Sequence, residues 1–179
     1  MSTTVLRLPS RLAAERAARR WVAAAVADLS AVDGSRALAV GPGGSAYSAL
    51  LARRHQHVLL ATGLLGSVAV VPGGSGSGTV RVSRRQLLEV EPEIDGRFEL
   101  VLAVDAIRRL DVDQLVLPHL GWLLARGGQL VALDPVGQAD WAAIQRRYLN
   151  WLPAASVQPV QPGLMGLRWR SPTGPVITL

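Results

Sequence analysis

Apolar side chains recur at helical spacing near the start of the chain. They lie three or four residues apart, as on one face of a helix, at Ala14, Ala18, Trp21, Val22, Ala25 and Leu29. This pattern predicts an amphipathic helix over residues 11–29. We take residues 1–34 as an N-terminal helical segment and residues 35–179 as an α/β domain.

Beyond residue 34, short apolar runs alternate with helical patterns. The runs predict strands at residues 35–40, 57–62, 80–83, 98–106 and 129–133, with helices at 46–54, 118–126 and 139–151. Residues 63–71 fit either a short helix or a strand, and PGGSGSGT at 72–79 predicts a flexible loop. The proline-rich tail predicts strands and turns, forming an antiparallel edge of the sheet. This alternation predicts a single-domain α/β fold with a mostly parallel, Rossmann-like sheet and helices on both faces.

A glycine-rich turn joins the first predicted strand to the helix that follows it. The segment ALAVGPGGSAYSALLAR, residues 37–53, includes Gly41, Gly43, Gly44 and Ser45. Glycines allow a ligand to approach the backbone closely, and the exposed amides at a helix start suit anionic or polar groups. The turn is therefore a candidate ligand-binding element, although the same pattern also occurs where a turn is simply tight. Trp21 of the N-terminal helix is a candidate to cover it.

Two further segments extend the pattern. They are DGRFELVLAVDAIRRLD at 95–111 and LGWLLARGGQLVALDP at 120–135. Together with the glycine turn, residues 36–135 resemble the class I S-adenosylmethionine (SAM)-dependent methyltransferases. The resemblance implies SAM as the cofactor, with Gly41, Gly43, Gly44, Ser45 and Thr62 at the positions that would bind it.

The acidic positions of that family are not acidic here. The acid two residues before the first glycine is replaced by Ala39, and the ribose-binding acid at the end of strand two by Ala61 and Thr62. The acid that follows strand three is replaced by Ser83-Arg84-Arg85, and residues 89–93 hold the nearest glutamates. A carboxylate hydrogen-bonded to a ligand contributes about 1.5–3 kcal/mol. The resemblance therefore implies weakened or lost SAM binding.

Three polar residues are candidates for chemistry. Asp105 and Asp134 each follow a predicted strand at the carboxyl edge of the sheet, where open α/β sheets bind ligands. If close together they could act as an acid–base pair, and otherwise each could cap a helix or turn. His119, near the start of a helix, is the third candidate. The histidines show no metal-ligand spacing and cysteine is absent, so we expect no metal site.

Composition narrows the range of partners. The chain has 19 basic and 13 acidic residues, and every basic residue is arginine. The arginines are scattered rather than gathered into an arm, so we do not expect nucleic acid as a partner. Asp28 ends the apolar run of the first helix too early for a secretory signal, and no stretch reaches the ~20 apolar residues that span a membrane. The arginine-only, cysteine-free composition is typical of a high-GC bacterial, cytoplasmic protein.

The functional hypotheses follow from the missing acids. We interpret the chain as a degenerate class I methyltransferase-fold protein that serves as a partner subunit or performs non-methylating small-molecule chemistry. The aromatic stripe of Trp141, Tyr148 and Trp151 is typical of a core or of a contact in a homo- or hetero-oligomer. The alternative is an active SAM-dependent methyltransferase acting on a small molecule. The sequence leaves open whether the protein is an enzyme.

Overall fold

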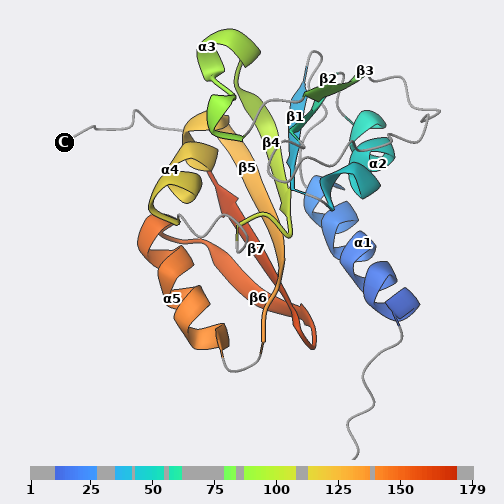
Figure 1. Ribbon diagram of the computed structural model, residues 1–179, viewed down its shortest axis with the longest axis vertical. Coiled ribbons are helices and arrows are strands. Elements are labelled where there is room, and N and C mark those ends of the chain that lie inside the picture. Colours follow the sequence, from blue (N-terminus) through green and yellow to red (C-terminus); the bar gives the residue numbers. More distant parts are fainter. Residues whose placement is uncertain are drawn as a thin grey trace, which may run out of the picture.

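The computed structural model shows a seven-stranded sheet covered by helices (Figure 1). It describes residues 11–27, 35–41, 43–54, 57–61, 79–83, 87–107, 113–137 and 140–172. No helix within these residues is long and apolar enough to cross a membrane.

The sheet has the strand order β3-β2-β1-β4-β5-β7-β6. Its strands are β1 (Arg36–Val40), β2 (His57–Ala61), β3 (Thr79–Ser83), β4 (Phe98–Val104), β5 (Leu124–Pro135), β6 (Ser156–Gln161) and β7 (Leu164–Arg170). Strands β1 to β5 pair in parallel, whereas β7 is antiparallel to both β5 and β6. The predicted mostly parallel sheet and its antiparallel edge are therefore confirmed.

The helices cover both faces of the sheet, as predicted. They are α1 (Arg11–Ala27), α2 (Ser48–Ala52), α3 (Pro92–Asp95), α4 (Asp113–Leu123) and α5 (Trp141–Trp151), with 3-10 turns η1 (Gly44–Tyr47) and η2 (Leu87–Glu89). Figure 1 shows α1 and α2 on one side of the sheet and α4 and α5 on the other.

Alternate residues of the central strands fill two separate cores. On the α1 side, Val22 packs in one cluster with Ala39 and Leu100. On the other side, Tyr148 of α5 packs in a second cluster with Leu38 and Val101. Both faces of the parallel strands are thus buried, which explains why these strands read as continuous apolar runs.

The predictions for the region around α4 were wrong in detail. The regular helix was expected to start at Pro118 and run to Arg126, but α4 begins at Asp113 and contains Pro118 in its interior. Pro118 is exposed, while Leu117 and Leu120 are fully buried, so apolar burial outweighs the lost hydrogen bond. Strand β5 starts at Leu124, and its register with β4 shifts before the predicted strand begins.

Other differences are smaller. The helix expected after the glycine turn is divided into η1 and the short α2. The aromatic stripe of α5 is not uniform, because Tyr148 is buried whereas Trp151 is 44% exposed. The ambiguous segment 63–71 and most of the predicted loop at 72–79 lie outside the described residues.

Candidate functional site

The glycine turn follows β1 at the carboxyl edge of the sheet and packs against the end of β4. Gly41 has φ +89°, and a Cβ there would overlap the carbonyl oxygen of Val104 and lie 2.8 Å from Ala106 Cβ. A Cβ on Gly43 would overlap Val104 Cγ1. Both glycines are therefore required by the close approach of another strand of the same chain, whether or not a ligand is present.

The position two residues before the turn lies directly beneath it. Ala39 is 2% exposed, and a Cβ on Gly44 would lie 3.4 Å from Ala39 Cβ. The amide of Gly44 donates to the carbonyl of Gly41 at 3.0 Å, which closes the turn into η1. Ser45 continues η1. A buried alanine thus occupies the place where the family resemblance implies an acid.

The end of β2 lies beside the glycine turn, as the resemblance to the methyltransferases implied. Ala61 is the last residue of β2 and pairs with Val40, directly before the turn. No carboxylate therefore stands at the last position of either β1 or β2. Thr62, the other candidate at this point, lies outside the described residues, as do Arg84 and Arg85.

Residues 89–93 hold three glutamates that could replace a missing acid, but two of them lie at the edge of the sheet opposite the glycine turn. Glu91 precedes α3, and Glu93 lies within it. Because α3 leads into the first residue of β4, both belong to the amino edge of the sheet, opposite the glycine turn. Glu89 is exposed in η2, whose Leu87 packs with the α4 side of the core.

Asp105 is the first residue after β4, between the glycine turn and β5. Its backbone is left-handed, with φ +52°, and its amide donates to the carbonyl of Leu133 at 2.8 Å. A non-glycine residue in this conformation is uncommon and is found disproportionately at functional sites. Asp105 is half-buried, so the turn still has one carboxylate close to it.

Asp134 lies next to Asp105 along the edge but in a different environment. Because Val104 pairs with Leu133, Asp105, which follows β4, lies beside Asp134 of β5. Asp134 is only 1% exposed, and its Oδ2 accepts a hydrogen bond of 3.1 Å from the Tyr148 hydroxyl of α5. Asp105 is therefore half-buried, whereas Asp134 is buried and bonded to α5.

His119 contacts η2 and its own helix, rather than the two aspartates. Its Nε2 lies 3.0 Å from the carbonyl oxygen of Leu87 in η2, and its ring is 5.4 Å from that of Trp122. The contact with Leu87 connects α4 to η2, whereas the ring contact with Trp122 lies within α4. No three His, Asp or Glu side chains of the described residues come together as metal ligands would.

Tyr47 lies at the turn, whereas Trp21 does not. Tyr47 ends η1 and is 7% exposed, and burial raises the pKa of its phenol, with Arg19 opposing and Glu15 adding to the shift. Trp21 was expected to cover the turn but lies over β7 instead, where a Cβ on Gly166 would be 2.5 Å from its ring. Gly166 leaves room for the ring, and β4 and β5 separate β7 from β1.

No model of a known protein family matches the sequence, and no curated protein sequence matches it. Solved structures do match the fold. N-methyltransferase NodS from Bradyrhizobium japonicum WM9, in complex with S-adenosyl-L-homocysteine (SAH), is 15% identical with a TM-score of 0.56, over 86% of this chain and 87% of NodS. The DhpI–SAH complex is 14% identical with a TM-score of 0.61, over 93% of this chain and 88% of DhpI.

A putative SAM-dependent methyltransferase from Streptococcus mutans is also similar. It is 10% identical with a TM-score of 0.62, over 85% of this chain and 48% of the other. The chain therefore has the fold of the class I SAM-dependent methyltransferases.

Proposed function

We propose that this chain is a degenerate methyltransferase-fold protein in which SAM binding is weakened or lost. The observation that carries the proposal is the carboxyl edge of β1 and β2. Ala39 is buried beneath the turn, and β2 ends at Ala61, so neither strand supplies a carboxylate there.

The expected loss of affinity is large. A hydrogen bond to a charged group contributes about 1.5–3 kcal/mol, and two such groups are absent. Each 1.4 kcal/mol corresponds to a factor of ten in the dissociation constant, so the loss is roughly a hundred- to ten-thousand-fold. Such a protein would bind SAM too weakly for ordinary methyl transfer.

Two roles remain within this proposal, and a different feature supports each. The exposed Leu149 and Trp151 of α5 support a partner subunit in a homo- or hetero-oligomer, because they offer apolar area to another chain. The left-handed, half-buried Asp105 supports non-methylating chemistry on a small molecule at the carboxyl edge.

The alternative is an active SAM-dependent methyltransferase for a small molecule. It is favoured by the retained glycines at positions 41 and 43, by Asp105, and by the SAH complexes among the similar structures. In that case another group must replace the missing carboxylates.

Restoring one acid tests the proposal. We expect Ala61→Asp to tighten SAH binding by about ten- to a hundred-fold, because it returns a carboxylate to the end of β2. Ala61→Asn is the matched neutral control and should bind SAH several-fold more weakly than Ala61→Asp. Isothermal titration of the folded variants measures both. Equal affinity of wild type and Ala61→Asp would contradict the account of the missing acids.

A further inference from the structure

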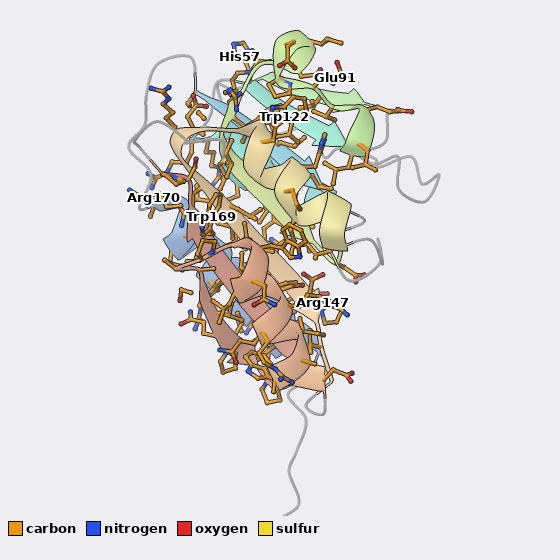
Figure 2. All side chains as sticks on the ribbon, turned by 90° about the vertical axis from the view of Figure 1, so that its left-hand side faces the viewer. His57, Glu91, Trp122, Arg147, Trp169 and Arg170 are labelled. Carbon is orange, nitrogen blue, oxygen red and sulfur yellow. The ribbon has the colours of Figure 1, made fainter. Side chains whose placement is uncertain are left out.

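Three large apolar side chains are exposed at the amino edge of the sheet, opposite the glycine turn. Leu88 of η2 is 46% exposed, Ile94 of α3 is 69% exposed and Trp122 of α4 is 42% exposed. Figure 1 shows α3 at the upper end of the molecule, and Figure 2 shows Trp122 at the same end as Glu91, which precedes α3. Exposed apolar side chains that lie together are typical of a protein–protein contact.

The contacts of α4 hold Trp122 between η2 and the start of β4. The ring of His119 lies 5.4 Å from that of Trp122, and its Nε2 lies 3.0 Å from the carbonyl oxygen of Leu87, the neighbour of Leu88. Arg97, directly before β4, donates from Nη1 to the carbonyl oxygen of Trp122 at 2.6 Å. The backbone of Trp122 is therefore held in place, so little order is lost when its side chain is buried in a contact.

Acidic side chains flank this apolar patch on one side. Glu91 and Glu93 are exposed at the start of α3. This helix lies over the starts of β1 and β2, because Nη2 of Arg36 donates to the carbonyl oxygen of Asp95, and a cavity there is lined by Asp95 and by His57 of β2. The acidic side of the patch is therefore the side toward β1 and β2.

Basic side chains flank the patch on the other side. Arg97 is exposed at the start of β4, and Arg126 is exposed among the first residues of β5. Because the sheet order is β2-β1-β4-β5, α3 and Arg126 lie on opposite sides of the start of β4. None of Glu91, Glu93, Arg97 and Arg126 forms an ion pair with another described residue. The surface thus has an acidic side, an apolar centre and a basic side.

We propose that this surface is the contact between two copies of the chain in a symmetric dimer. In a contact with twofold symmetry the same patch serves both copies, so an acidic side on each copy can meet the basic side of the other. With the axis beside Trp122, α3 of each copy lies against Arg126 of its partner. A partner of uniform charge would match only one side of the patch, whereas a second copy matches both.

The dimer also places each kind of side chain where contacts between proteins usually have it. Trp122 is buried at the centre together with Leu88 and Ile94, and the charged side chains form the rim. The contact uses no residue of the glycine turn, so it does not depend on whether SAM binds.

Sedimentation velocity over a range of protein concentrations tests the contact. We expect an equilibrium between monomer and dimer, and we expect Trp122→Ser to raise its dissociation constant at least about ten-fold. Trp151→Ser is the matched control, because it removes a tryptophan of similar exposure, 44%, from α5, and it should change the constant less than about three-fold. Both positions are exposed, so both variants should fold.

Charge reversal tests the pairing across the axis. Glu93→Arg and Arg126→Glu should each weaken the dimer about ten-fold, because each places like charges against one another twice in the dimer. The double variant exchanges the two charges and should return to within about three-fold of the wild type. Both side chains are exposed, so the monomer should be unaffected.

The proposal would be overturned by any of three results. The wild-type protein could remain monomeric up to millimolar concentration. Trp151→Ser could weaken the dimer as much as Trp122→Ser, which would place the contact on α5. Finally, the double variant could associate no better than either single variant, which would show that Glu93 and Arg126 do not face each other across the axis.

Discussion

The two edges of this sheet differ in what they leave for a ligand. At the carboxyl edge, the close approaches at Gly41 and Gly43 are made by Val104 of the same chain. At the amino edge, where β1, β2 and β4 begin, a cavity is lined by polar and apolar residues, Arg36 and Asp95 among them. A glycine motif that is typical of a binding site can thus be explained by packing within the chain.

The largest expected effect concerns the glycine turn itself. Gly41→Ala should lower the free energy of unfolding by about 3 kcal/mol, because it adds strain at positive φ to an overlap with Val104. Gly163→Ala is the matched control, since it has φ +79° with nothing within 4 Å, and should cost only about 1 kcal/mol. Urea denaturation measures both, and equal losses would show that the contact with β4 is unimportant.

A second pair of variants sharpens this result. Gly43→Ala should cost about 2 kcal/mol because its Cβ would meet Val104 Cγ1. Adding Val104→Ala removes that methyl group, so the double variant should lose less than the sum of the single variants, by about 1 kcal/mol. Strict additivity would mean that the two residues do not share the space.

An intermediate effect is expected at Asp134. Tyr148→Phe removes a hydrogen bond to a buried carboxylate and should lower the free energy of unfolding by about 2 kcal/mol. Thermal or urea unfolding at neutral pH measures it. Unchanged stability would mean that this hydroxyl does not hold Asp134 on the α5 side.

The smallest effect is expected at Asp105. Its left-handed backbone disfavours a side chain, so Asp105→Gly should be more stable than Asp105→Ala by about 1 kcal/mol. Paired urea denaturation of the two variants measures this difference. If Asp105→Gly were the less stable variant, the backbone at this edge would not be strained.

The fold could be predicted because burial leaves a direct record in the sequence. The continuous apolar run of β4 and the three- and four-residue steps of α1 each correspond to an observed element. Pro118 misled the prediction of α4, since local preference marks it as a helix start whereas buried neighbours continue the helix through it.

The site was less predictable, because its properties depend on contacts between distant segments. The missing acids could be located, since Ala39 and Ala61 have fixed places at strand ends. Nothing local shows that Val104 fills the space beside Gly43, or that Tyr148 bonds to Asp134. The cavity beside Arg36 likewise depends on three strand starts that are far apart in the chain.

The central claim is that the carboxyl edge does not bind SAM in the manner of the family. Isothermal titration of the wild-type protein with SAM and with SAH tests it most directly. We expect no heat of binding below the millimolar range, because no carboxylate stands at the last position of β1 or of β2. Saturable binding of either compound at micromolar concentration would contradict the claim and favour an active methyltransferase.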